Sequence, residues 1–446
     1  MRLTGNKKDS VIRLAALVVI GVMCIGFAVL LSRCASDATA AENLNVEENT
    51  PLPRLNSCLN NSMSDIDSLS GLDKMINAYL TRWEIKGAQF AYVRHDSLLY
   101  VKGFGYSDKD KGTKMETSNI MRMASVSKLV TAVGIMKLRD DGLISLSDKV
   151  FGANGILNDS IFTSSIRDKR YFDITVEHLL RHEGGFGVKG GDPMFSTRYI
   201  IARHHLTEPP DNTTLLTILL KKRLDFIPGT SHSYSNLGYM ILSLVIEKIS
   251  GKPYEEFMQS EVLEPAGCYD FHIAGNYEKD RLPGETVYYM HGGSEPQPEF
   301  NNSGKLVNRC YGENDITNLK GAGAWVASAS ELSRLVASID LYPEIPDILS
   351  SESIALMTEY DEKRFAIGWN FTPDNGPWIR TGSMAGTSAI ILKYPDGDCL
   401  ILLTNTSTWK GHGFSKDTRD FFARLRQKYS KKMPRRNLFC QPVKPQ

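Results

Sequence analysis

The sequence predicts an α/β (α+β) fold of two lobes: an antiparallel sheet flanked by helices from both ends of the chain, and an inserted, mainly helical lobe. Two observations support this prediction. Strand-like runs occur near residues 88–106 and again near 378–405. Between them, the apolar residues from about 125 to 265 recur mostly at helical spacing, so the strands from both ends are expected to form one sheet.

The first 31 residues, 1–31, are predicted to be a membrane anchor or an export signal. Their uncharged, apolar part is the run 14–31, which as a helix would be roughly 27 Å long, close to the hydrocarbon thickness of a bilayer. Basic residues that precede this run favour a cytoplasmic amino terminus and an exported remainder: Arg2, Lys7, Lys8 and Arg13. An uncleaved anchor ranks above a signal peptide cut after Ala40. Both rank above a lipoprotein at Cys34, because Arg33 stands where a small residue is needed.

Polar segments are predicted on either side of the folded domain. Residues 32–69 lack hydrophobic periodicity and are expected to form a linker. The end of the chain, 431–446, is a basic tail that we expect to be solvated. The domain between them, 70–430, is divided into a sheet lobe at about 70–124 and 320–430 and a helical lobe at about 125–319.

Inside the domain, local patterns place the elements. Two strand-like runs surround residues 94–96 and predict a β-hairpin. A helix that starts near Ser125 runs apolar until Gly142, a residue suited to the left-handed position that ends a helix. Residues 395–398, Pro-Asp-Gly-Asp, predict a turn between two late strands, and an amphipathic helix follows at about 417–430.

Composition and spacing exclude several functional classes. A formal net charge of +1 gives no indication of a nucleic-acid partner. The seven cysteines include no C-x-x-C pair, so zinc is not expected, and nothing in the sequence requires a cofactor. His178 and His182 could bind a metal with Glu183, but no further ligand follows in pattern, and a structural role is favoured. Export would permit a disulfide, for which Cys58 and Cys440 are candidates.

Ser125 and Lys128 form an S-x-x-K motif at the start of a predicted helix. Residues three apart on a helix share a face, so the hydroxyl and the amine can meet. A serine hydroxyl is a poor nucleophile at neutral pH, and an amine with a lowered pKa can take its proton. The helix N-terminus adds partial positive charge where an oxyanion would develop. On its own the motif is weak, because a capped helix start with a solvated lysine has the same letters.

Two further segments strengthen this interpretation. Tyr234 and Asn236 lie where a proline-glycine turn leads into a helix, and they can relay a proton and donate to a substrate carbonyl, respectively. At the end of a predicted strand, Gly382 would let a substrate approach the backbone, while Arg380 and Thr381 would offer donors to a carboxylate. Taken singly, each segment also has a plain structural interpretation, as a core tyrosine, a helix cap or a strand end.

In this order, the three segments resemble the serine β-lactamase and penicillin-binding-protein superfamily, most closely its class C β-lactamase, D-aminopeptidase and esterase branch. That branch combines S-x-x-K, Y-x-N and a strand motif such as K-T-G or H-x-G. Blocks such as ITVEHLLRHEGGF and GAGAWVASASELSRLV extend the likeness over roughly residues 70–430. The resemblance implies a β-lactamase-like two-lobed fold and hydrolysis through an acyl-enzyme.

The resemblance also implies roles for single residues. Ser125 would attack a carbonyl, and Lys128 and Tyr234 would share its proton and protonate the leaving group. Asn236 would orient the substrate. The backbone N–H groups of Ser125 and Ser383 would form the oxyanion hole.

The function expected from these residues is that of a serine hydrolase of the cell envelope, anchored in the membrane with its catalytic domain on the extracytoplasmic side. Its substrates would be D-amino-acid peptides, β-lactam-like amides or small esters. Arg380 replaces the usual lysine or histidine of the strand motif, and we expect this change to affect which substrates bind. The long loops 183–212 and 275–320 are expected to shape the pocket. The alternative is a non-catalytic envelope protein that keeps the fold for binding or scaffolding. A nucleophile-elbow hydrolase is not supported, because the sequence has no G-x-S-x-G.

Overall fold

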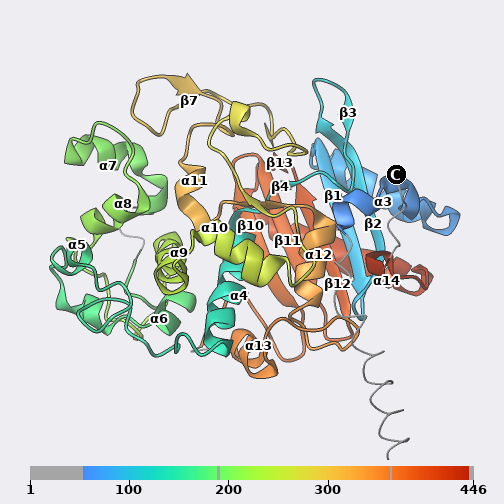
Figure 1. The fold of residues 1–446 in the computed structure, drawn as a ribbon. Helices are drawn as coiled ribbons and strands as arrows, with labels where there is room; N and C mark the ends of the chain where they lie inside the picture. The colour runs from blue at the N-terminus through green and yellow to red at the C-terminus, as the bar shows by residue number, and fades with distance from the viewer. Residues whose placement is uncertain (1–53, 188–190, 362–363, 441–446) are drawn as a thin grey trace, which may run out of the picture. The chain divides into compact units, whose positions relative to one another are not determined.

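The computed structural model describes residues 54–187, 191–361 and 364–440, and it has the mixed α/β architecture that the sequence predicts (Figure 1). At its centre is a six-stranded antiparallel sheet in the order β10-β11-β12-β1-β2-β3. Its strands are β1 (Gly87–Arg94), β2 (Ser97–Asp108), β3 (Thr113–Lys114), β10 (Trp378–Met384), β11 (Thr387–Lys393) and β12 (Asp398–Thr404). The two ends of the domain therefore share one sheet, as predicted.

The predicted hairpin and turn both lie in this sheet. β1 and β2 are joined by His95 and Asp96, whose φ angles of 43° and 56° suit a tight hairpin turn. β11 and β12 are joined through Gly397, at φ 86°. Every residue of β11 and β12 is buried, because these strands lie inside the sheet with both faces covered. β10 lies at the edge of this sheet, and the outer side of its backbone pairs with the preceding segment through an isolated bridge between Ile379 and Phe371.

Helices cover both faces of the sheet and form the second lobe (Figure 1). Along the described part of the chain, the α-helices are α2 (Leu55–Cys58), α3 (Ser70–Arg82), α4 (Ser127–Asp140), α5 (Ser160–Thr163), α6 (Val176–Leu180), α7 (Thr197–His204), α8 (Asn212–Leu219), α9 (Asn236–Ser250), α10 (Tyr254–Met258), α11 (Ile316–Leu319), α12 (Ala329–Ala337), α13 (Ser351–Thr358) and α14 (Phe414–Tyr429). Short strands outside the main sheet are β4 (Met121–Arg122), β5 (His272–Ile273), β6 (Tyr289–Met290), β7 (Gln297–Pro298), β8 (Leu306–Val307), β9 (Trp325–Ala327) and β13 (Thr406–Ser407). In the view of Figure 1, α5, α6, α7 and α8 lie on the side away from α3 and α14.

The two faces of the sheet pack into different cores. α3 and α14, from opposite ends of the domain, cover one face, where the rings of Tyr79 and Phe421 stack with their centroids 4.0 Å apart. Alternate strand residues such as Leu402 point into this core, and the intervening residues such as Leu403 point into the other. That second, larger core holds α4, α9 and α12. The buried α4 is thereby fixed between the sheet and the helical lobe.

The ends of the folded domain differ from the prediction. From residue 54 onward, the segment 32–69 is not a linker, because α2 and two 3-10 turns fold onto the domain and bury Leu55. The segment 431–446 is not solvated throughout, since Leu438 and Phe439 are each only 2% exposed. Both segments bury isolated apolar residues within polar sequence, and isolated residues produce no periodic pattern.

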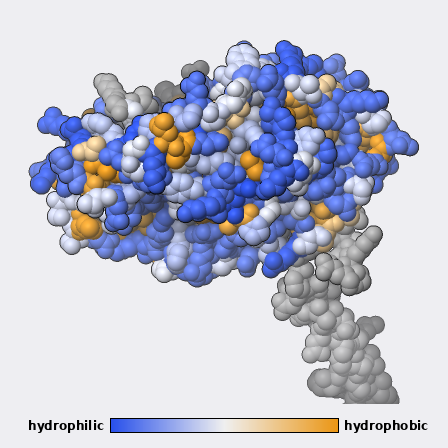
Figure 2. Space-filling model, turned by 90° about the horizontal axis from the view of Figure 1, so that it is seen from above, coloured by the Kyte–Doolittle hydropathy of each residue, from blue (hydrophilic) through white to orange (hydrophobic). Residues whose placement is uncertain are grey.

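Two predictions concern parts of the chain outside the described residues. The predicted anchor, 14–31, is one of them, and within the described residues no helix is long and apolar enough to cross a membrane. The other is the Cys58–Cys440 bridge: Cys58 has no disulfide partner among the described side chains, and that of Cys440 is not described, so the bridge stays a prediction. On the face seen in Figure 2, hydrophobic residues form small, separate patches in a hydrophilic surface.

Candidate active site

Ser125 lies in a 3-10 turn, Ala124–Val126, that leads directly into α4. Ala124 has a φ of 48°, in the left-handed region that residues other than glycine seldom adopt. The helix behind the turn is rigidly packed, with Leu129 and Val130 fully buried. Ser125 itself is partly exposed and lines a cavity. A strained turn on a buried helix therefore presents one hydroxyl to the cavity.

Lys128 is fully buried, with its amine 3.4 Å from the Oγ of Ser125. The amine also donates to the side-chain oxygen of Asn236 and to the backbone oxygen of Ala322, at 2.6 Å each. A neutral amine has two N–H donors and one lone pair. Because an amide oxygen and a carbonyl oxygen can only accept, they would take the two donors of the neutral form, and its lone pair would be left for the Ser125 hydroxyl. This is the arrangement that a general base requires. The protonated form would instead donate to that oxygen.

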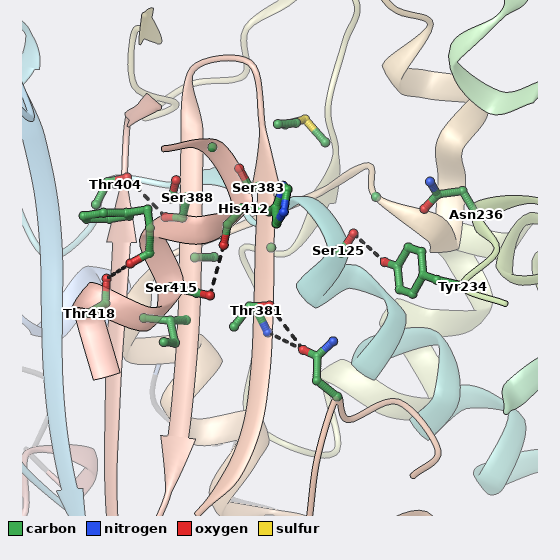
Figure 3. A pocket seen from close by; sticks show the side chains of 18 of the residues that line it. Ser125, Tyr234, Asn236, Thr381, Ser383, Ser388, Thr404, His412, Ser415 and Thr418 are labelled. Carbon is green, nitrogen blue, oxygen red and sulfur yellow. Dashed lines mark hydrogen bonds between the residues drawn. The ribbon is translucent and has the colours of Figure 1, made fainter. Parts of the chain in front are cut away.

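Tyr234 contacts the same hydroxyl (Figure 3). Its phenol donates to Ser125 Oγ at 2.7 Å, and the amine of Lys128 lies 4.7 Å from the centroid of its ring. Burial raises the pKa of Tyr234, but the charges of Lys128 and Arg380, together with hydrogen bonds to Lys128 and Ser125, outweigh burial and bring the pKa below its usual value. Burial is also the largest influence on Lys128 and lowers its pKa; Tyr234 opposes this, and Arg380 adds to it. Both pKa values thus move toward the range in which the two groups can transfer protons.

The amide of Asn236 is held at both ends. Its oxygen accepts from Lys128, and its nitrogen donates to Asp192 Oδ2 at 2.6 Å. Asp192 in turn accepts from the backbone N–H of Met194 at 2.9 Å, which fixes the carboxylate. The observed contacts of Asn236 therefore orient the lysine, whereas the sequence led us to expect contacts with substrate. Sequence reasoning missed Asp192, whose only signal is that of a turn aspartate before a proline.

Gly382 allows β10 to touch the nucleophile turn. A Cβ at this position would lie 2.1 Å from the backbone oxygen of Met123 and 2.9 Å from the backbone nitrogen of Ser125. Any side chain would therefore push the strand and the turn apart. The Cβ side of Gly382 is thus taken by the protein's own backbone, while the residue also borders the cavity, so the approach of a substrate to this glycine stays a prediction.

The outer edge of β10 carries backbone groups that are not paired within the sheet. The N–H of Thr381 donates outward to Asn370 Oδ1 at 2.8 Å, and its hydroxyl donates to the same oxygen at 3.3 Å. N–H groups two residues apart on a strand point the same way, so the N–H of Ser383 also points outward. Asn370 had no sequence signal, because its contact with β10 depends on how the preceding loop folds back.

Arg380 differs from its predicted role of binding a substrate carboxylate. It is 1% exposed, it does not line the cavity, and its Nε donates to the backbone oxygen of Ser125 at 2.9 Å, with a second contact from Nη2. The strand register explains this direction. Arg380 pairs with Ile391, which belongs to the core that holds α4, so alternation turns the guanidinium toward the nucleophile turn.

A cavity of about 280 Å³ opens beside Ser125 (Figure 3). Each of the two long loops expected to shape a pocket contributes one side chain, Phe195 from the first and Leu319 from the second. Ser383 on β10 and His412, just before α14, border the cavity and lie next to each other in the close-up view. The nucleophile candidate thus faces a pocket built by both lobes.

The histidine pair considered for a metal has other partners. The Nδ1 of His178 accepts from the N–H of Thr175 at 3.3 Å, and the Nδ1 of His182 accepts from the N–H of Ser235 at 3.1 Å. Burial lowers the pKa of His182 well below its usual value, which keeps this nitrogen an acceptor. Across the residues that the structure describes, no group of three His, Cys, Asp or Glu side chains is arranged to hold a metal ion.

Comparison with known proteins gives matches over most of the chain. A family model described as Beta-lactamase matches residues 72–424. A penicillin-binding protein of Bacillus subtilis (strain 168) is 27% identical over 197 residues, which are 44% of this chain and 39% of that protein. The esterase EstB of Burkholderia gladioli is 24% identical over 361 residues, 75% of this chain and 90% of that protein. The structure of D-amino acid amidase from Ochrobactrum anthropi SV3, complexed with L-phenylalanine amide, is 17% identical with a TM-score of 0.61, covering 83% of this chain and all of that one. The match thus spans about two fifths of the Bacillus protein, and the amidase shows the fold alone.

Proposed function

The chain belongs to the β-lactamase family, and we propose from this premise that it is a serine hydrolase that forms an acyl-enzyme on Ser125. One observation carries the proposal: Tyr234 Oη and Lys128 Nζ lie 2.7 Å and 3.4 Å from the same hydroxyl oxygen. A binding or scaffolding protein has no physical need to bury a lysine beside a partly exposed serine. The substrate classes to test are D-amino-acid peptides, β-lactam-like amides and small esters.

The proposed reaction begins when neutral Lys128 takes the proton of Ser125 as Oγ attacks the substrate carbonyl carbon. The N–H groups of Ser125 and Ser383 would stabilise the oxyanion; removing one such donor typically costs roughly 10²–10³ in turnover. The tetrahedral intermediate then collapses, and the leaving group takes a proton from Tyr234 as its bond to the carbonyl carbon breaks. The proton on Lys128 then passes to the Tyr234 phenolate, which restores both groups. Water next attacks the acyl-enzyme as Lys128 takes its proton, and Tyr234 returns a proton to Ser125 Oγ as the acid leaves; a second transfer from Lys128 to Tyr234 closes the cycle.

Neighbouring residues would keep this machinery in position. Asn236, oriented by Asp192, accepts one of the two hydrogen bonds that fix the lysine amine, and the backbone oxygen of Ala322 accepts the other. Arg380 holds the carbonyl of the nucleophile itself and places a positive charge behind the site. Asn236, Asp192 and Arg380 therefore have positioning roles in the proposal.

The proposal is tested by covalent labelling with a fluorophosphonate probe, followed by intact mass measurement. The wild-type chain should gain one adduct and should hydrolyse p-nitrophenyl butyrate, whereas Ser125→Ala should show neither property. Labelling and turnover of Ser125→Ala at the wild-type rate would overturn the assignment. The alternative, a non-catalytic envelope protein, predicts that the wild-type chain is neither labelled nor active.

We also propose that the protein is exported to the cell envelope and held by residues 14–31, with the catalytic domain outside the cytoplasm. The support is the apolar run and the basic residues before it. Protease added to intact spheroplasts of an expressing bacterium should digest the catalytic domain of the full-length chain. Digestion only after lysis would contradict this orientation.

A further inference from the structure

Apart from His412, the cavity beside Ser125 is lined by uncharged side chains. Among the described residues that border it there is no lysine, arginine, aspartate or glutamate, and the titratable ones are Tyr234 and His412. Apolar side chains such as Leu319 and Met384 share the wall with hydroxyl groups. At about 280 Å³, the cavity is at or below the lower end of the range of small-molecule sites, about 300–1,000 Å³. It fits a small, neutral group.

Two cations lie near the nucleophile, but neither faces the cavity. Lys128 is fully buried and donates to Asn236 and Ala322. Arg380 is almost fully buried, and its guanidinium donates to the backbone oxygen of Ser125. A substrate carboxylate in the cavity would therefore meet no free positive charge from either side chain.

The neutral donors of Thr381, at the edge of β10, are also engaged. Both the N–H and the hydroxyl of Thr381 donate to the side-chain oxygen of Asn370. A carboxylate that moved from water to this edge would lose hydration without gaining a counter-charge or a free hydrogen-bond donor from Thr381. Such a transfer is costly, because an ionised group needs a charged or hydrogen-bonding partner to leave water.

We propose that this site selects neutral esters and amides and discriminates against substrates that carry a carboxylate near the scissile bond. The residue that would bind such a carboxylate, Arg380, serves the nucleophile instead. The selectivity rests on the proposed function above and adds the substrate class to it.

The test uses two pairs of substrates whose members differ in one carboxylate. p-Nitrophenyl hexanoate and p-nitrophenyl hydrogen adipate share a leaving group and differ at the end of the acyl chain. Benzylpenicillin methyl ester and benzylpenicillin differ on the leaving-group side. For each pair, kcat/KM or the acylation rate, divided by the spontaneous hydroxide rate, should be at least about tenfold higher for the neutral member. Equal rates, or faster reaction of the acidic members, would overturn the selectivity.

A matched pair of variants tests whether the missing charge is the cause. Met384→Lys adds an ammonium group to the cavity wall, and Met384→Gln adds polarity without charge. The ratio of acidic to neutral substrate turnover should rise at least about tenfold in the lysine variant relative to the glutamine variant, and the rise should shrink at high salt. An unchanged ratio would contradict the explanation. Absence of any turnover that depends on Ser125 would refute the proposed function, and the selectivity with it, whereas equal turnover of both members would refute the selectivity alone.

Discussion

The contact between β10 and the nucleophile turn makes Gly382→Ala a sensitive test of the site. The added Cβ would lie 2.1 Å from the Met123 oxygen and 2.9 Å from the Ser125 nitrogen, while an ordinary van der Waals contact begins at 3.4 Å. Both neighbouring atoms are backbone atoms, so neither can rotate away. The strand and the turn must therefore separate by about 1 Å or more, which moves the N–H groups of Ser125 and Ser383 apart.

This displacement of the two N–H groups should lower the rate of catalysis. Misplacement by about 1 Å in a catalytic arrangement costs on the order of 100-fold, and losing one oxyanion donor costs roughly 10²–10³. We expect Gly382→Ala to lower kcat/KM for p-nitrophenyl butyrate by about 100-fold or more, while overpacking lowers Tm by a few degrees. The control is Gly413→Ala, whose Cβ would have its nearest neighbour 4.0 Å away and whose activity should stay within about twofold of wild type. A folded Gly382→Ala variant with activity near wild type would refute the reasoning.

Three further predictions concern proton transfer and positioning. Lys128→Met and Tyr234→Phe should each slow acylation by roughly 100-fold or more while keeping a cooperative thermal melt; stopped-flow acylation near the wild-type rate would remove that residue from the mechanism. Arg380→Met deletes a charge that lowers the pKa of Lys128, so the rising limb of the pH profile of kcat/KM should move about one unit to higher pH, and less in Arg380→Lys. A rising limb that stays in place or moves to lower pH would contradict the predicted effect of Arg380 on Lys128. A loss of activity in Arg380→Met that is confined to acidic substrates would contradict it as well. Asp192→Asn leaves a single acceptor oxygen on this side chain, whereas the amide of Asn236 and the backbone N–H of Met194 each need an acceptor. We expect kcat/KM to fall about tenfold. Unchanged activity would show that Asp192 does not position the amide of Asn236.

The parts of the site that could be predicted from the sequence are those whose geometry is local or tied to a family motif. Ser125 and Lys128 meet because they are three residues apart at a helix start, and the phenol of Tyr234 reaches them from a segment that the resemblance singles out. The sheet was also predictable, since its strands carry continuous apolar runs and its hairpin is closed by turn residues such as Gly397.

The remaining features depend on tertiary structure. The direction of Arg380 is set by its pairing with Ile391, and a strand's register cannot be read from the strand's own letters. Asp192 and Asn370 act on residues distant in sequence through loops that lack periodicity. Leu438 lies in a basic segment but packs against the larger core. Nothing in the sequence of that segment indicates this packing.

The central claim is that one hydroxyl, activated by a buried amine, becomes covalently attached to substrate. The most direct measurement is rapid-quench mass spectrometry of the protein mixed with p-nitrophenyl butyrate, followed by proteolysis and mapping of the modified peptide. The account predicts a transient butyryl group on Ser125 that does not accumulate in Lys128→Met on the same timescale. A butyryl group on a different residue, or steady turnover with no covalent species on a chain that lacks Ser125, would contradict it.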